Sequence, residues 1–203
     1  MVKRQKAQAI SLTESASLVL SPSLYLGPCS AASNKTFLEA NGITHVLSIG
    51  STPSRKIEGV VYQRLSLNDS ATSLLSKVTS EACKFIDGAI GPNSKGGGKG
   101  KILVHCSAGI SRSPSLVVAY LMKSRHMPLK AALGQVVRAR PQVSPNPGFL
   151  QQLKQLEEEL FGSVSLEVDE LPKREQDRLA LFADDAVMNA EVAMSGGNAS
   201  GAG

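Results

Sequence analysis

The chain has 203 residues and a formal net charge of +5, and 42% of its residues are hydrophobic. This length and composition indicate one domain with tails and a mainly aliphatic core, because tryptophan is absent and only 4% of the residues are aromatic. No apolar run approaches the roughly 18 residues of a membrane-spanning helix, so a membrane span is not expected. Cys29, Cys83 and Cys106 are widely spaced, which fits neither a disulfide framework nor a metal site and indicates a reducing compartment.

The charge of the chain is distributed unevenly. Residues 163–203 hold eight acidic and three basic side chains, so they carry −5 and residues 1–162 carry +10. A basic body suits an anionic partner such as a phosphoprotein substrate. Nucleic acid is not expected as a partner, because no basic patch is interleaved with aromatic residues and no nucleic-acid-binding motif occurs. The oligomeric state is left open.

Residues 1–15 are predicted to form a flexible basic arm. Lys3, Arg4 and Lys6 are followed by no apolar run of the kind that a secretory signal contains. The expected location is therefore cytoplasmic, and the basic cluster leaves the nucleus open as an alternative. A transit peptide is a further alternative, because this segment is basic and rich in serine.

The middle of the chain predicts alternating strands and helices. The strands are short runs rich in apolar or β-branched residues, and the helices carry apolar residues three and four positions apart. In chain order we expect strands 16–20 and 23–26, helix 30–40, strands 44–49 and 60–67, helix 74–90, strand 101–105, and helices 114–122, 128–140 and 147–161. Such alternation indicates an α/β fold with a central sheet flanked by helices on both faces.

Two segments differ from this pattern. Residues 91–100 are rich in glycine and predict a flexible surface insertion, since no Gly-Lys-Ser/Thr follows to make a nucleotide-binding loop. Residues 163–203 predict an acidic, largely disordered tail after a folded domain at 16–162. A short helix at 173–189, with Leu179, Phe182 and Val187 on one face, is an alternative for part of this tail. A tail that folds over the basic body and inhibits it is another, although a solvated tail is favoured.

The most informative segment joins the strand at 101–105 to the helix at 114–122. Cys106 is followed by five residues and then by Arg112. A turn from strand to helix directs several backbone N–H groups at one point, at the positive end of the helix. Gly109 lets the loop bend, Pro114 suits the first helical turn, and the Arg112 guanidinium can hold two oxygens of a phosphate. The same donors lower the pKa of a cysteine, whose thiolate is the nucleophile.

This segment resembles the signature of the cysteine-based protein tyrosine phosphatases. The matching residues are His105-Cys106-x2-Gly109-x2-Arg112-Ser113. Three further motifs resemble the dual-specificity branch, namely Leu24-Tyr25-Leu26-Gly27, Ala119-Tyr120-Leu121-Met122 and Asn146-Pro147-Gly148-Phe149. The resemblance extends from about Leu18 to Phe161 and suggests a small, atypical member, because no room remains for a kinase-docking domain.

The resemblance implies both a fold and an activity. The fold is a mixed sheet of about five strands with the catalytic loop at the carboxyl end of the central strand. The activity is hydrolysis of phosphotyrosine and phosphoserine/threonine in proteins through a phosphocysteine intermediate, with no cofactor. Two alternatives remain, namely the same chemistry on RNA 5′-phosphate, phosphoinositide or phosphoglucan, and a phosphate-binding module without turnover. The uncharged residues 107–111 argue against an inositide with several phosphates.

The resemblance also assigns roles in the chemistry. Cys106 attacks phosphorus, and Asp69 protonates the leaving oxygen and later activates water; the alternative for Asp69 is a turn residue or helix cap. Phosphate is held by the Arg112 side chain and by the backbone N–H groups of Ser107, Ala108, Gly109, Ile110, Ser111 and Arg112.

Three further residues are expected to support the loop. The resemblance implies that the Ser113 hydroxyl bonds the thiolate, and a helix cap is the alternative role for this side chain. His105 is expected to bond neighbouring backbone and shape the loop rather than transfer protons. Asn146 is expected either to brace the loop or to cap the last predicted helix.

Overall fold

A computed structural model describes residues 15–91 and 100–183 of the chain. Its centre is a five-stranded sheet in the order β1-β2-β5-β3-β4. The strands are β1 Ser17–Leu20, β2 Leu24–Gly27, β3 His45–Ile49, β4 Val61–Leu65 and β5 Ile102–His105. β1 pairs antiparallel with β2 and the other pairs are parallel, so the sheet is mixed, as predicted, with β5 in its middle.

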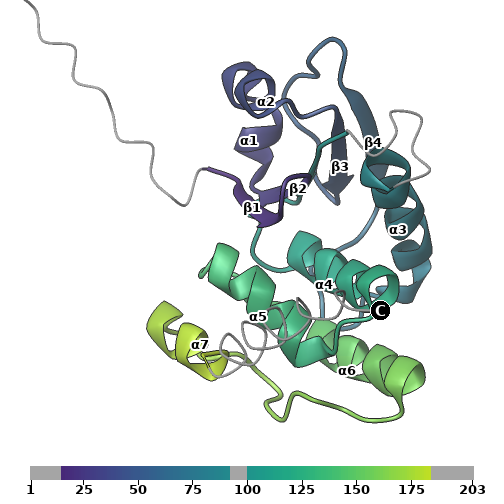
Figure 1. Cartoon of the computed structure of the whole chain (residues 1–203), viewed down its shortest axis with the longest axis vertical. Helices are drawn as coiled ribbons and strands as arrows, with labels where there is room; N and C mark the ends of the chain where they lie inside the picture. The colour runs from purple at the N-terminus through teal and green to yellow at the C-terminus, as the bar shows by residue number, and fades with distance from the viewer. Residues whose placement is uncertain (1–14, 92–99, 184–203) are drawn as a thin grey trace, which may run out of the picture.

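Helices cover both faces of this sheet (Figure 1). They are α1 Cys29–Ala32, α2 Lys35–Asn41, α3 Ser76–Ile90, α4 Arg112–Arg125, α5 Leu129–Ala139, α6 Pro147–Phe161 and α7 Glu175–Leu181. Successive residues of β5 point to opposite faces. Ile102 and Val104 therefore join the larger core with residues of α3 to α6, whereas Leu103 joins the smaller core with residues of α1 and α2. The predicted covering of both faces is confirmed.

The helix predicted at 30–40 is divided into two. α1 ends at Ala32, and Asn34 caps α2 by accepting a hydrogen bond from the Phe37 N–H on its Oδ1 at 3.1 Å. An asparagine side chain that satisfies a free N–H at a helix start favours such a boundary over a helix interior. The prediction of one continuous helix was therefore wrong at this point.

Residues 163–183 are folded onto the domain, which corrects the prediction of a tail that is disordered from residue 163. Leu166, Leu171 and Phe182 are buried in the main core. α7 lies within the alternative helix that we predicted at 173–189. In the sequence these apolar positions are surrounded by many charged residues, so the segment was predicted to be disordered. One of the charged residues, Arg178, is itself only 5% exposed.

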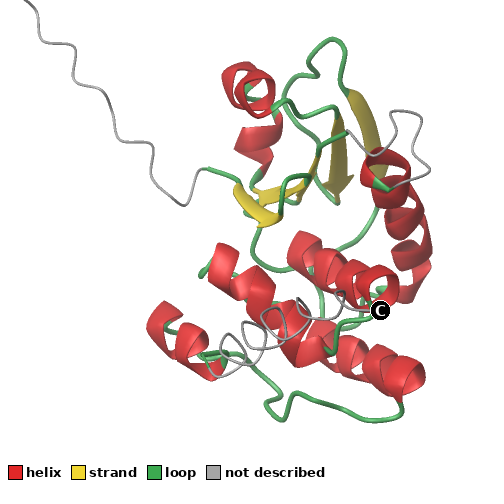
Figure 2. Cartoon of the chain, viewed as in Figure 1, coloured by secondary structure: helices red, strands yellow, loops and turns green. Residues whose placement is uncertain are grey.

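Hydrogen bonds hold this segment against α5 and α6, in the helical part of the molecule (Figure 2). The Glu157 carboxylate accepts from the Ser165 N–H at 2.8 Å and from the Ser165 hydroxyl at 2.6 Å. Arg138 Nη1 donates to the Phe182 carbonyl at 3.0 Å. Residues 184–203 of the tail, for which inhibition was an alternative, lie outside the described residues. The same is true of residues 1–14 of the predicted arm and residues 92–99 of the predicted insertion.

Candidate active site

The loop between β5 and α4 lies at the carboxyl end of the central strand. Gly109 adopts φ +68°, and a Cβ at this position would lie 2.5 Å from the Gly27 carbonyl oxygen at the end of β2. Only glycine combines this left-handed backbone with so close an approach. The loop is also tied to α1, because the Cys29 N–H donates to the Ser107 carbonyl at 3.0 Å.

The sulfur of Cys106 receives several hydrogen bonds inside this loop. The Gly109 N–H donates to Sγ at 3.3 Å and the Ser113 hydroxyl at 3.2 Å, and the residue is only 2% exposed. Burial by itself raises the pKa of the Cys106 thiol. The bonds from the Ser113 hydroxyl and from the N–H groups of Ser113, Gly109 and Ile110 outweigh burial and hold the pKa below its ordinary value. The site therefore favours a thiolate.

Ser113 contacts the sulfur rather than capping the helix. α4 begins at Arg112, so Ser113 lies inside its first turn and is fully buried. Its hydroxyl donates to Cys106 Sγ, which is the contact that the resemblance implied. Ser113 is therefore not the N-cap of α4, which was the alternative role for its side chain.

Arg112 lies between the loop and Asp69. Its Nη2 donates to the Ser107 hydroxyl at 2.9 Å, and its Nε lies 3.6 Å from Asp69 Oδ2. Gly50, directly after β3, has φ +67°, and a Cβ there would lie 2.4 Å from Arg112 Nη1. The guanidinium thus packs against bare backbone, and Gly50 is a site residue that we did not predict.

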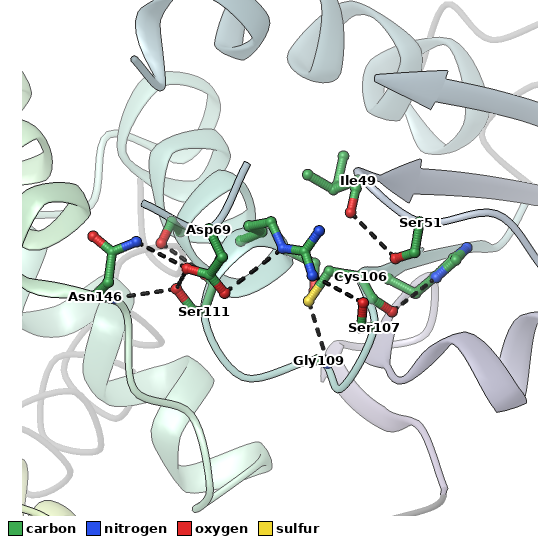
Figure 3. A network of polar contacts seen from close by, with 12 residues as sticks. Ile49, Ser51, Asp69, Cys106, Ser107, Gly109, Ser111 and Asn146 are labelled. Atoms are coloured by element: carbon green, nitrogen blue, oxygen red, sulfur yellow. Dashed lines mark hydrogen bonds and ion pairs between the residues drawn. The ribbon is translucent and has the colours of Figure 1, made fainter. Parts of the chain in front are cut away.

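Asp69 is held beside the loop by two donors from different elements. Its Oδ1 accepts from the Ser111 hydroxyl at 2.6 Å and from Asn146 Nδ2 at 2.8 Å. Asn146 also caps α6, because its Oδ1 accepts from the Phe149 N–H at 2.9 Å. Figure 3 shows Asn146 and Ser111 on one side of Asp69 and Cys106 with Ser107 on the other. The Asn146 side chain therefore caps α6 and holds Asp69, whereas the loop itself is contacted by the Asn146 backbone N–H, which donates to the Ser111 hydroxyl at 3.2 Å.

The loop that contains Asp69 packs against the first turns of α6. A Cβ at Gly148 would lie 2.1 Å from the Ala71 carbonyl oxygen, so the loop touches the helix backbone. Gln152 accepts from the Leu75 N–H at 2.8 Å and donates to the Ser73 carbonyl at 2.9 Å. Neither Gly148 nor Gln152 was predicted as a supporting residue; the Asn-Pro-Gly-Phe motif was the available signal for the first.

His105 connects the start of the loop with β3. Its Nδ1 lies 3.1 Å from the Cys106 carbonyl oxygen, which can only accept, so Nδ1 carries the proton. Burial lowers the pKa of His105, and a neutral ring leaves Nε2 to accept from the Ser48 hydroxyl at 2.7 Å. As expected, the side chain bonds neighbouring backbone; Ser48 is a partner that the sequence did not indicate.

Replacing His105 with glutamine is expected to raise the pKa of Cys106 while turnover persists. Glutamine has no group at the position of Nδ1, so the hydrogen bond to the Cys106 carbonyl is lost even if the amide still bonds Ser48. Without that bond the N–H donors of the loop point less well at Sγ. Fewer aligned donors stabilise the thiolate less. The measurement is the pH dependence of Cys106 alkylation, with His45→Gln as the matched control at the far end of β3. An unchanged alkylation profile for His105→Gln would refute this role.

Cys83 and Asp87 lie outside this cluster, on α3. Burial, followed by the nearby Asp87, raises the pKa of Cys83 to about 11. Asp87 accepts from the Tyr120 hydroxyl at 3.0 Å on the exposed side of α3. Within residues 15–91 and 100–183, no group of three or more His, Cys, Asp or Glu side chains could hold a metal ion. In the same ranges no helix has the length and apolar character to cross a membrane.

Comparison with known proteins agrees with this geometry. The family model for the catalytic domain of dual specificity phosphatases matches residues 24–159. Over 142 residues the chain is 39% identical to dual specificity protein phosphatase 1B of Arabidopsis thaliana, covering 70% of this chain and 81% of that protein. It is 41% identical to human dual specificity protein phosphatase 5, covering 70% of this chain and 36% of that protein.

Solved structures show the same relationship. The crystal structure of human DUSP28 matches with a TM-score of 0.64 and 32% sequence identity, covering 71% of this chain and 94% of that one. The family match at residues 24–159 spans β2 to β5, the Cys106 loop, α4, α5 and most of α6. The chain therefore belongs to the dual specificity phosphatases and is a protein phosphatase.

Proposed function

We propose that this protein hydrolyses phosphotyrosine and phosphoserine/threonine in proteins through a phosphocysteine intermediate on Cys106. The observation that carries the proposal is the convergence of donors on the buried Cys106 sulfur, in a loop that ends at the N-terminus of α4. A thiolate at the centre of such donors can attack phosphorus while the same groups hold the phosphate oxygens. The names of the curated relatives support proteins as the substrate class.

In the first step the Cys106 thiolate forms a bond to phosphorus, and the bond from phosphorus to the leaving oxygen breaks. Arg112 and the backbone N–H groups of residues 107–112 stabilise the charge on the equatorial oxygens. Asp69 donates its proton to the leaving oxygen, so the alcohol or phenol departs neutral. The position of Asp69, beside Arg112 and at the edge of the loop, supports this role.

In the second step water attacks the phosphocysteine. Asp69, now a carboxylate, accepts a proton from that water, and inorganic phosphate leaves as the bond from sulfur to phosphorus breaks. Cys106 departs as a thiolate. The Ser113 hydroxyl, 3.2 Å from Sγ, is placed to stabilise the negative charge that returns to sulfur. The cycle consumes one water and needs no metal or cofactor.

The character of the loop supports single phosphates on protein. Residues 107–111 are uncharged, whereas a ligand with several phosphates would need additional cations. Ile110 is 37% exposed at the rim and offers an apolar surface for a phosphotyrosine ring or an aliphatic side chain. We also propose that the enzyme acts in signalling in the cytoplasm or nucleus, because its three cysteines are free and the thiolate requires reducing conditions.

The test uses the purified 203-residue chain with reductant and a chelator of divalent metals. Phosphotyrosine and phosphothreonine versions of one peptide are compared with an RNA 5′-phosphate, a phosphoinositide and a phosphoglucan. We expect phosphate release from both peptides and little from the other three. Turnover confined to RNA, lipid or glucan would replace the proposed substrate class, and binding of these ligands without turnover by the wild type would indicate a binding module.

A further inference from the structure

Arg140 is a buried cation behind the catalytic loop that the chemistry above does not use. It follows the last residue of α5 and is only 1% exposed. Its Nε donates to the Gly109 carbonyl at 3.0 Å and its Nη2 to the Ala108 carbonyl at 3.0 Å. The remaining arm, Nη1, donates to the Ser15 carbonyl at 2.8 Å, just before β1.

These bonds fix the direction of two successive peptide groups. A trans peptide is planar, with its carbonyl and N–H pointing in opposite directions. The peptide whose carbonyl is that of Ala108 carries the Gly109 N–H, which donates to Cys106 Sγ at 3.3 Å. The next peptide, with the Gly109 carbonyl, carries the Ile110 N–H, which helps to lower the pKa of the Cys106 thiol. A guanidinium on the carbonyl side therefore aims both N–H groups at the reactive centre.

The segment after Arg140 continues this arrangement. The Ser144 N–H donates to the Ile110 carbonyl at 2.8 Å, and the Asn146 N–H donates to the Ser111 hydroxyl at 3.2 Å. Residues 140–146 thus hold the outer side of the loop from Ala108 to Ser111. Within this segment Arg140 contributes the positive charge.

The charge of Arg140 also acts on the sulfur. Burial lowers the pKa of the guanidinium, and the neighbouring Cys106 thiolate opposes that effect. The interaction is mutual, so the positive charge of Arg140 stabilises the thiolate form of Cys106. When a carbonyl accepts a charge-assisted hydrogen bond, the N–H of the same peptide group becomes a stronger donor, because hydrogen bonds in a chain polarise one another.

We propose that Arg140 is a positioning residue, which aims and strengthens the Gly109 and Ile110 N–H groups that hold the Cys106 thiolate and the phosphate oxygens. The role rests on the proposed function, since those oxygens belong to its substrate. Arg140 does not touch the substrate itself. It acts through the backbone of the loop, from a position 34 residues after the nucleophile.

The test compares Arg140→Met with Arg178→Met. Arg178 is a matched control, because it is also buried and donates to three backbone carbonyls, those of Pro141, Pro172 and Lys173, none of which lies in the loop. Two properties are measured in each folded variant: the pH dependence of Cys106 alkylation by iodoacetamide, and the affinity for orthovanadate as the oxyanion probe. Turnover of a phosphotyrosine peptide is measured alongside, as kcat and KM separately.

We expect Arg140→Met to shift the alkylation midpoint to higher pH and to weaken vanadate binding about tenfold or more, the scale of one charge-assisted hydrogen bond. Its kcat falls more than its KM rises, because the loop donors act on the transition state. Arg178→Met should leave the pH midpoint of alkylation unchanged and the vanadate affinity within about twofold of the wild type. The melting temperature should fall in both variants, because each loses buried hydrogen bonds. His105, Cys29, Arg112 and Asp69, the other titratable or charged groups around the loop, are the same in both proteins.

Arg140→Lys keeps the positive charge in case the methionine variant does not fold. One ammonium cannot reproduce the fork on two adjacent carbonyls, so we expect an intermediate loss of vanadate affinity. A folded Arg140 variant with unchanged midpoint and affinity would overturn the proposal. Failure of both variants to fold, with Arg178→Met folded, would also count against it, since Arg140 would then serve stability alone.

These measurements separate this inference from the proposed function. Alkylation and vanadate binding require no phosphoprotein substrate. If the wild type has the low midpoint and binds vanadate but releases no phosphate from either peptide, the proposed substrate class fails and the role of Arg140 still stands.

Discussion

Replacing Cys106 with serine is expected to abolish turnover, with a loss of roughly 10⁴-fold or more. The donors from Gly109 and Ser113 lie 3.3 Å and 3.2 Å from the sulfur and stabilise a thiolate. A serine hydroxyl has a far higher pKa than a thiol, so the same donors leave it protonated and weakly nucleophilic. The measurement is inorganic phosphate released from phosphotyrosine and phosphothreonine peptides under reducing conditions.

The serine variant should still bind its substrate. The loop backbone, Arg112 and Arg140 are unchanged, so we expect a phosphopeptide to bind Cys106→Ser without being consumed. Cys83→Ser is the matched control, because Cys83 is a buried cysteine on α3 whose pKa is raised to about 11, and its loss should leave turnover intact. Residual turnover by Cys106→Ser near the wild-type rate would refute the assignment of the nucleophile.

Replacing Asp69 with asparagine is expected to slow phosphopeptide hydrolysis by roughly 10² to 10⁴-fold, the usual contribution of a general acid. Asparagine has nearly the same shape, and its Oδ1 can still accept from Ser111 and Asn146, which now bond Asp69 at 2.6 Å and 2.8 Å. The loop should therefore keep its geometry and its phosphate affinity. What is lost is the proton for the leaving oxygen and the base for the attacking water.

The dependence on leaving group makes this assignment specific. A phosphothreonine alkoxide needs a proton far more than an activated aryl oxide does, so Asp69→Asn should lose much more turnover on the peptide than on an activated aryl phosphate. Rates on the two substrates are compared for the variant and for Asp87→Asn, a control on α3 that should behave as wild type. An equal loss on both substrates would indicate that Asp69 acts on phosphate binding or on loop structure instead.

The position and form of the Cys106 loop could be predicted from the sequence because its geometry is local. Cys106, Gly109, Arg112 and Ser113 lie within eight positions, between a buried strand and a helix start. A turn of this length constrains where each N–H and side chain can point, whatever the rest of the chain does. For the same reason the alternation of apolar strands with helical spacing was enough to predict the α/β class.

The supports of the loop depended on tertiary structure. Arg140 reaches Gly109 from 31 positions away, and Asn146 reaches Asp69 from 77. Each residue type is compatible with a solvated surface or a simple cap, so neither its identity nor its spacing reveals the contact. The packing of α5 and α6 against α4 brings these residues together. Once Arg140 is buried, its guanidinium must hydrogen-bond to carbonyl oxygens instead of to water.

Residues 163–183 show the same difference between what the local sequence determines and what tertiary packing determines. The sequence by itself determined a strand, loop and helix with a cysteine at their junction, because local backbone geometry and hydrophobic spacing carry that information. It did not determine that residues 163–183 fold, because their charge density resembles that of a disordered segment. Only the tertiary structure decided this, since Leu166, Leu171 and Phe182 gain stability from apolar surface that α5 and α6 provide once they have packed.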